Sequence, residues 1–263
     1  LAAWKILIHT AYGIRVNQVV FNSERDAAQE SLFDAQPGLT VDRASTWSPE
    51  GMRYSALVFR RALPQMLQAS PAIRAAATYR YDLVDIARQT LANESRVLLP
   101  RIAAAYRAKD RARFEARTQC WLGLMSLQDR LLASNRHFLL GRWLARARPW
   151  ASSPAELARL DFDARSILTV WGDRQASAGA GLHDYANRDW AGLTGGYYRL
   201  RWRKYFDALD QSLRTGAAPR AIDWFAIGDR WSHGSGQYSE RPSGDSFALA
   251  SRVAAVMRRG GCP

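Results

Sequence analysis

The sequence predicts an all-α protein: a single compact multi-helix domain of roughly nine helices that spans residues 1–263. Apolar residues recur at helical spacing along most of the chain, whereas the alternation typical of strands is nearly absent. An apolar fraction of 48% and ten tryptophans are typical of a chain with a packed core and not of a disordered one. The length is sufficient for one large core.

The N-terminal part is predicted to be one helix followed by a long irregular segment. Residues Leu1–Tyr12 read as a helix that ends at Gly13. Residues 14–48 lack a clear period, and Pro37-Gly38 is a turn signal within them. Because this segment is long for a loop, we expect its own aromatic side chains to hold it in place. These are Phe21, Phe33 and Trp47.

Serine–proline pairs predict the next two helices. Ser48-Pro49 supplies a capping hydroxyl and a proline at the first helical position, and Pro64 should kink or shorten the helix that follows. Ser70-Pro71 starts another helix, which runs toward Pro100, where we expect a bend.

The central helices are predicted from their apolar faces and caps. One covers Phe114–Ala133, and Asn135 caps a short helix after it. Ser153-Pro154-Ala155-Glu156 is a capping box with proline at the first helical position. The helix that it opens should stop at Trp171-Gly172.

The C-terminal third contains three further predicted helices. Asp184 is a candidate cap for a helix that reaches Leu193, after which Gly195-Gly196 interrupts the pattern. The next helix covers Tyr197–Leu213 and stops at Gly216, and Ser243-Gly244-Asp245 precedes the last helix. Residues 224–241 receive no assignment.

Sequence signals for catalysis, cofactors and metals are absent. There is no Gly-rich phosphate loop, no nucleophile-elbow motif and no paired-cysteine or His-Glu-x-x-His metal site, and the four histidines lie far apart in sequence. Taken alone, this is therefore not the sequence of a self-sufficient enzyme, and we expect no cofactor and no metal. No apolar run approaches a membrane span, so we expect no membrane partner. Two cysteines are too few for a disulfide framework, and Cys120 is expected to be a small core residue.

The charge leaves a second interpretation open. The formal net charge of +13 is typical of proteins that bind nucleic acid, although the arginines are scattered singly and interleaved with acids. A free-standing basic helical module for protein interaction or nucleic-acid binding therefore stays as the alternative. It predicts strongly salt-dependent binding to DNA or RNA.

The most unusual stretch runs from Arg165 to Arg203. Aromatic residues alternate there with short polar ones beside a Gly-rich loop. Sugar-binding sites have this composition, because the C–H faces of a sugar pack on aromatic rings and its hydroxyl groups need polar partners. The same residues are also compatible with caps and core packing, and composition alone favours these structural roles over sugar binding.

Several blocks of the chain resemble one known family. They are Trp171-Gly172, residues 182–193 with the run Asp184-Tyr185-Ala186-Asn187, and residues 197–203 with Tyr197-Tyr198 and Arg201-Trp202-Arg203. Residues 79–89, residues 134–144 and Ser243-Gly244-Asp245 fit as well. From about Ser48 onward, the sequence resembles the C-terminal domain of the α-N-acetylglucosaminidases, glycoside hydrolase family 89.

This resemblance implies a domain from a larger enzyme. Family members have a small N-terminal domain, a (β/α)8 barrel and then an α-helical domain, and they remove terminal α-linked N-acetylglucosamine with retention. Retention needs two carboxylates about 5–5.5 Å apart. In the family both are glutamates of the barrel, so the resemblance implies that this chain is a piece without catalytic residues and is inactive alone. It also implies a periplasmic or secreted protein in bacteria and a lysosomal one in animals.

The resemblance further implies that the helices form one wall of the sugar pocket. Trp171 and Tyr185 would contact the sugar with their rings, Asp184 and Asn187 would lie nearby as polar groups, and Trp190 is a weaker candidate contact. Four residues would support the wall: Arg165, Arg201, Trp202 and Arg203. Of these, Arg165 and Arg203 would form buried ion pairs. The loop at residues 176–181 looks longer than in the family.

Two partners follow from this interpretation. They are glycans that end in α-linked N-acetylglucosamine and the barrel of the same parent chain. The isolated domain should then expose an apolar face where the barrel packs.

Overall fold

The computed structural model describes residues 1–13, 30–46, 48, 52 and 54–261. This part of the chain is helical and has no strand, only an isolated bridge between Leu139 and Ala191, which confirms the all-α prediction. Its α-helices are α1 (Ala2–Ile8), α2 (Ala56–Phe59), α3 (Ala62–Met66), α4 (Pro71–Arg74), α5 (Ala77–Arg107), α6 (Arg111–Ala133), α7 (Leu140–Ala147), α8 (Pro154–Ser166), α9 (Arg199–Thr215), α10 (Trp224–Ser232) and α11 (Ser246–Arg258).

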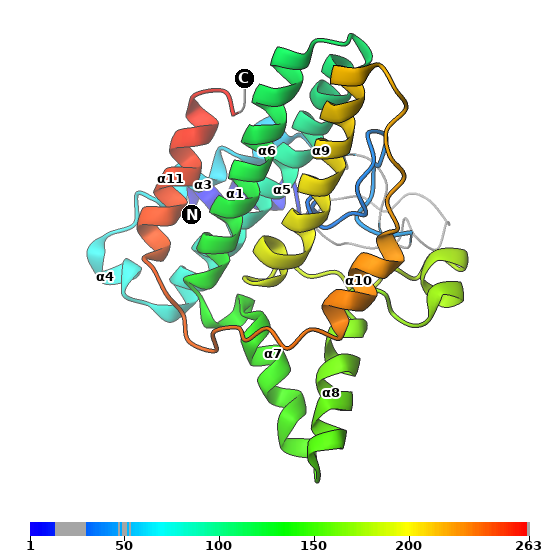
Figure 1. Cartoon of the computed structure of the whole chain (residues 1–263). Coiled ribbons are helices and arrows are strands. Elements are labelled where there is room, and N and C mark those ends of the chain that lie inside the picture. The colour runs from blue at the N-terminus through cyan, green and yellow to red at the C-terminus, as the bar shows by residue number, and fades with distance from the viewer. Residues whose placement is uncertain (14–29, 47, 49–51, 53, 262–263) are drawn as a thin grey trace.

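The core lies around the two longest helices, α5 and α6. They pack along each other, with α9 against α6 and α11 against α5 (Figure 1). Trp121 of α6 and Trp202 of α9 are fully buried, and their rings meet at 4.5 Å. Phe33 meets the edge of Trp121 at 4.8 Å, which confirms that it anchors the irregular N-terminal segment. Phe21 and Trp47, its expected companions, lie outside the described residues.

Two prolines have opposite effects on their helices. The helical pattern before Pro64 breaks into α2 and α3, as predicted, because a proline ring clashes with the carbonyl four residues earlier, at Arg60. The helix that starts at Pro71 is only one turn long, and α5 begins separately at Ala77. The helix α5 continues past Pro100 to Arg107.

The predicted caps are mostly where the sequence places them. The hydroxyl of Ser153 accepts a bond from the backbone N–H of Glu156 at 3.2 Å. The Glu156 carboxylate accepts from the N–H of Ser152 at 2.7 Å and not from that of Ser153. Asp245 caps α11, and Gly216 ends α9 with a left-handed φ of 73°. Ser48-Pro49 cannot be assessed, since Pro49 lies outside the described residues, and the cap of α2 is Ser55.

The helix predicted from Asp184 to Leu193 is wrong. Residues 184–192 form turns and extended chain, and a π-helical turn at Leu193–Tyr198 leads into α9. Asp129 of α6 fixes this turn, because its carboxylate accepts from the backbone N–H groups of Gly192 and Gly195 at 2.8 Å each. A side chain at Gly195 would collide with that carboxylate, which explains why glycine stands there.

Two further expectations concern sulfur and membranes. Cys120 is half-buried and packs against the core, as expected, but it is disulfide-bonded, which the low cysteine count did not favour. Cys262, the other cysteine of the sequence, lies outside the described residues. None of the described helices combines the length and apolar character that a membrane crossing requires.

Candidate functional site

Two loops bring together the aromatic residues singled out by the sequence. After α8, a turn at residues 167–170 leads to Trp171, and the second loop carries Tyr185. Their rings meet edge to face, with centroids 4.8 Å apart. Tyr185 is 40% exposed and Trp171 is half-buried, so neither ring is enclosed in the core. The loop at residues 176–181 therefore does not keep these rings apart.

Both loops pass through a left-handed backbone conformation. Trp171 has φ = 66° and Asp184 has φ = 57°. Aspartate adopts this region at modest cost, but a bulky residue such as tryptophan is an outlier that persists only where its surroundings enforce it. Here the N–H of Trp171 donates to the carbonyl of Ser166 at 2.8 Å, and that of Asp184 donates to the carbonyl of Thr169 at 2.7 Å. These bonds tie the two loops to each other and to α8.

A buried ion pair lies beneath the aromatic pair. Arg201 of α9 donates from Nη1 to Oδ2 of Asp184 at 2.7 Å, and the two side chains are 1% and 0% exposed. Burial by itself lowers the pKa of Arg201, but Asp184 and the neighbouring tyrosines outweigh it and raise the pKa above its usual value. Arg201 therefore stays charged at any physiological pH.

Arg201 also connects the site to the N-terminal segment. Its Nη2 donates to the carbonyl of Asp34 at 2.8 Å, and its guanidinium lies over the ring of Tyr197 at 4.3 Å. Burial raises the pKa of the Tyr197 phenol, so this group is neutral and can accept from Arg201 at 3.3 Å. One side chain thus joins α9, the loop of Asp184 and residues 34–35.

Asp184 and Asn187, expected as polar groups near the sugar, are both buried. With both oxygens buried and the pair to Arg201 in place, the Asp184 carboxylate holds the loop and does not face the surface. Asn187 is 8% exposed and donates to the backbone carbonyl of Asp184 at 3.1 Å. Trp190 is half-buried and packs on Trp143 of α7 at 5.7 Å.

The predicted supporting residues have different surroundings. Trp202 lies in the core and donates to the carbonyl of Phe33 at 3.0 Å. Arg165 is 1% exposed, donates to the carbonyl of Gly236 at 2.6 Å and lies over Trp231. No carboxylate pairs with it within the described part of the chain, so the ion pair predicted for it is wrong. Arg203 is exposed on α9, so its buried ion pair is wrong as well. On a helix, Arg201 and Arg203 face different sides.

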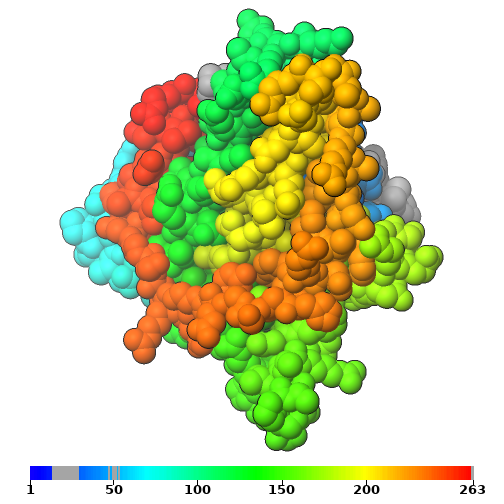
Figure 2. All heavy atoms as spheres, viewed as in Figure 1, coloured from blue at the N-terminus to red at the C-terminus, as the bar shows by residue number. Residues whose placement is uncertain are grey.

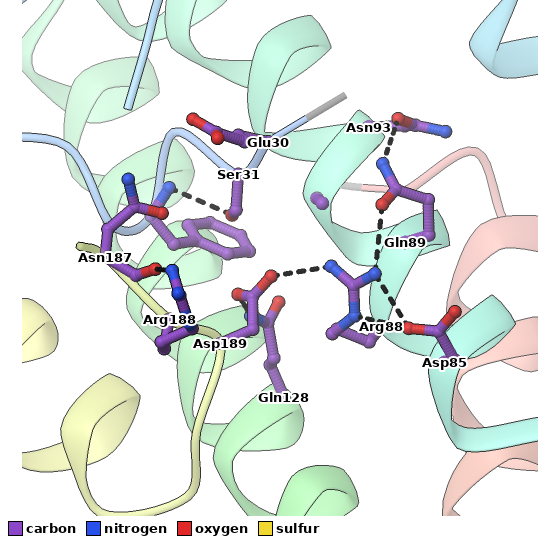
Figure 3. Close-up of polar contacts among 12 residues, drawn as sticks. Glu30, Ser31, Asp85, Arg88, Gln89, Asn93, Gln128, Asn187, Arg188 and Asp189 are labelled. Atoms are coloured by element: carbon purple, nitrogen blue, oxygen red, sulfur yellow. Dashed lines mark hydrogen bonds and ion pairs between the residues drawn. The ribbon is translucent and has the colours of Figure 1, made fainter. Parts of the chain in front are cut away.

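Sequence reasoning gave no role to a second polar cluster next to the site. Figure 3 shows Asp189 between Arg88 of α5 and Gln128 of α6. Arg88 donates to Asp189 at 2.7 Å and to Asp85 at 2.8 Å, and Gln128 donates to the other oxygen of Asp189. Burial by itself lowers the pKa of Arg88, but the two carboxylates raise it. The one available signal was that arginine and aspartate occur in both resembling blocks, 79–89 and 182–193.

Two hollows adjoin the loop of Tyr185. One, of about 310 Å³, lies between the π-helical turn Gln175–Gly179 and the start of α10, which carries Trp224 and Phe225. The other, also about 310 Å³, is lined by residues 41–46, and His183 lines both. In Figure 1 the turn at Gln175–Gly179 projects beside α10, in yellow-green. The described residues contain no cluster of His, Cys, Asp or Glu able to hold a metal ion.

Comparisons with known proteins agree with this architecture. The family described as "Alpha-N-acetylglucosaminidase (NAGLU) C-terminal domain" matches residues 1–255. Human alpha-N-acetylglucosaminidase is 28% identical over 260 residues, which are 96% of this chain and 32% of the human protein.

Solved structures of a family 89 glycoside hydrolase from Clostridium perfringens share the fold. The complex with its substrate GlcNAc-alpha-1,4-galactose is 31% identical, with a TM-score of 0.90 over 98% of this chain and 29% of that chain. The complex with 2-acetamido-1,2-dideoxynojirmycin is 30% identical, with a TM-score of 0.90 over 99% of this chain and 29% of that chain. The chain therefore spans about a third or less of the length of its relatives. It belongs to the family of α-N-acetylglucosaminidase C-terminal domains.

Proposed function

We propose that this chain is the C-terminal part of a retaining exo-α-N-acetylglucosaminidase and forms one wall of the pocket for terminal α-linked N-acetylglucosamine. The observation that carries the proposal is the aromatic pair of Trp171 and Tyr185, which stays accessible on two loops locked by the pair of Asp184 and Arg201. The relative that was solved with GlcNAc-alpha-1,4-galactose supports the substrate class.

Within this wall the residues have two different roles. The rings of Trp171 and Tyr185 offer apolar faces on which the C–H groups of a sugar can pack. Asp184 and Asn187 are positioning residues, since both are buried and act on the loop of Tyr185. Trp190 belongs to the packing between that loop and α7.

The reactive carboxylates would come from another part of the parent protein. Retaining hydrolysis uses one carboxylate to attack the anomeric carbon and a second to protonate the leaving oxygen and then to activate water. We assign neither of these roles to a residue of this chain. The chain's contribution is to hold the sugar and to exclude water from one side.

An exposed apolar face supports association with a catalytic barrel. On α1, Ile8 is 56% exposed and Trp4 is 40% exposed, and Trp4 stacks with Tyr12 at 6.4 Å. Leu57 of α2, which packs next to α1, is 59% exposed. Such clustered apolar side chains are typical of surfaces that another domain covers. We propose that the barrel of the parent chain packs here.

We also propose that the protein works outside the cytoplasm. The disulfide at Cys120 supports this proposal, because disulfides persist mainly in secreted, periplasmic or lumenal proteins. A periplasmic or secreted location fits a bacterial source.

The test compares the complete polypeptide with this chain alone. The complete polypeptide should hydrolyse an aryl α-N-acetylglucosaminide with retention, and residues 1–263 expressed alone should not. In the complete polypeptide, Tyr185→Ala should lower kcat/KM about tenfold or more, since an aromatic contact contributes about 1.5–3 kcal/mol. Trp150→Ala, which removes a ring that is 80% exposed after α7, is the matched control. Turnover by the isolated chain, or equal kcat/KM for both variants, would refute the proposal.

A further inference from the structure

The hollow beside α10 has polar groups that the proposed sugar pocket does not use. It measures about 310 Å³ and lies between the π-helical turn Gln175–Gly179 and the start of α10, and neither Trp171 nor Tyr185 lines it. We call it the α10 hollow. Figure 2 shows the turn, in yellow-green, against the orange segment that carries α10. Binding sites for small molecules begin at about 300 Å³, so the hollow has room for one small ligand.

Three polar side chains that line the α10 hollow have atoms without a protein partner. Within the described residues, the hydroxyl of Ser177 and the amide of Gln36 make no hydrogen bond, and Ser177 is only 2% exposed. His183 directs Nδ1 to Oδ2 of Asp184 at 3.1 Å, and its Nε2 has no partner in the same part of the chain. Since buried polar groups are almost always hydrogen-bonded, these atoms indicate a ligand or bound water.

The carboxylate that holds Arg201 also orients His183. Because this carboxylate of Asp184 is an acceptor, Nδ1 of His183 carries the proton and donates to it. In the neutral ring Nε2 is then an acceptor, whereas the hydroxyl of Ser177 and the amide of Gln36 can both donate and accept. The hollow therefore offers both kinds of partner that a ligand hydroxyl group needs.

The arginines and the carboxylate that line the α10 hollow are already in ion pairs. Arg174 donates to both oxygens of Asp223, at 3.0 and 2.9 Å. Arg201 donates to Asp184 at 2.7 Å. A charged ligand would have to compete with these pairs, whereas a neutral ligand leaves them intact. The lining therefore favours an uncharged ligand that carries several hydroxyl groups.

Aromatic side chains form another part of the lining. Trp224 and Phe225 at the start of α10 are both half-buried. The guanidinium of Arg174 lies over the ring of Phe225 at 4.6 Å, so Trp224 is the better candidate for contact with a ligand. An indole ring packs favourably on the C–H groups of a sugar, but it offers water little. A ligand with an apolar face thus fits the hollow better than bound water alone.

We propose that the α10 hollow is a second carbohydrate site, which binds one neutral pyranose. Gln36, Ser177 and His183 bind its hydroxyl groups, and Trp224 packs on its ring. This inference stands on the lining of the hollow and does not rest on the proposed function. Since Trp171 lies outside the hollow, a sugar bound here and a sugar in the proposed pocket can be told apart.

The experiment follows the indole N–H signals of residues 1–263 by two-dimensional nitrogen–proton NMR during titration with sugars. The neutral probes are glucose, galactose and N-acetylglucosamine. Glucuronic acid is the charged probe, and glycerol has hydroxyl groups but no ring. Substitutions of single tryptophans by phenylalanine assign the signals of Trp224, which reports on the hollow, and Trp171, which reports on the proposed pocket. The signal of Trp150, which is 80% exposed, is the internal control.

The test variant combines Gln36→Met with Ser177→Ala, which removes two hydrogen-bonding groups and changes the side-chain volume little. The matched control combines Gln68→Met with Ser70→Ala. Both of these residues are exposed, lie outside the hollow and make no side-chain hydrogen bond within the described residues. Urea midpoints that match between the two variants show that folding is intact. The titration of the unaltered chain decides the question even if the test variant fails to fold.

The proposal predicts that at least one neutral pyranose moves the Trp224 signal, with a saturable Kd of about 1–10 mM. The test variant should raise this Kd about fivefold or more, because two hydrogen bonds are lost, and the control should change it less than about twofold. A Trp224 signal that no neutral sugar moves, tighter binding of glucuronic acid, an equal response to glycerol, or an equal loss in the control would overturn the proposal. If only the Trp171 signal moves, the proposed pocket holds and the α10 hollow fails.

Discussion

The buried pair of Asp184 and Arg201 gives the sharpest test of how the site is held. Arg201→Met removes the cation and leaves the Asp184 carboxylate, which is 0% exposed, without its partner at 2.7 Å. It also removes the hydrogen bond from Nη2 to the carbonyl of Asp34. Breaking a buried ion pair from one side costs about 3–5 kcal/mol. A domain of ordinary stability has about 5–15 kcal/mol in total, so a large share of it would be lost.

A double-mutant cycle separates the pair from its surroundings. Asp184→Asn should also destabilise the chain, because it leaves a buried guanidinium without its counter-charge. Once the arginine is absent, the same substitution should cost less or even stabilise, since it removes an unpaired buried charge. We expect a coupling energy of about 1–3 kcal/mol.

Urea unfolding followed by tryptophan fluorescence measures these changes, because Trp202 lies next to Arg201 in the core. The matched control is Arg203→Met, an exposed arginine on the same helix, which should change the free energy of unfolding by less than about 0.5 kcal/mol. A loss below about 1 kcal/mol for Arg201→Met, or additive effects in the cycle, would refute the structural role of the pair.

Three further predictions concern other parts of the fold. Burial first, and then nearby carboxylates led by Asp189, raise the pKa of Asp34 well above its usual value. The folded state therefore keeps a proton that the unfolded state loses, so stability falls as pH rises from the unfolded pKa to the folded one. Asp34→Asn should flatten this fall of the urea midpoint with rising pH. Ser153→Ala removes the cap of α8 and should cost about 0.5–2 kcal/mol by the same unfolding assay. Gly195→Ala places a Cβ 2.6 Å from the carboxylate carbon of Asp129, so the thermal midpoint should fall by an amount that corresponds to about 1–3 kcal/mol.

Much of the helical framework can be predicted from local sequence signals. The capping serine at Ser153, the aspartate at Asp245 and the glycine stop at Gly216 act within a few residues of themselves, and all three stand where the sequence predicts. Tertiary packing decides other features. The helix α5 continues through Pro100, because its packing on α6 and α11 outweighs one missing hydrogen bond.

In the candidate site, too, some features could be predicted from the sequence and others are set by tertiary packing. The resemblance singled out Trp171 and Tyr185, which the fold brings into contact across residues 172–184. It could not show that Asp184 is buried against Arg201, because the partner lies seventeen residues away on a different element. From local sequence Asp184 therefore looked like a helix cap, whereas the structure gives it a left-handed backbone and buries it completely. The cluster of Arg88 and Asp189 was hidden by a separation of 101 residues.

The central claim is that these helices supply a side of a sugar-holding pocket that another part of the polypeptide completes. Its most direct measurement is the affinity of the complete polypeptide for 2-acetamido-1,2-dideoxynojirmycin, the compound bound to the bacterial relative. By titration calorimetry, Tyr185→Ala should raise Kd about tenfold or more, and Trp150→Ala should leave it unchanged. An unchanged Kd for Tyr185→Ala in a folded protein would contradict the account.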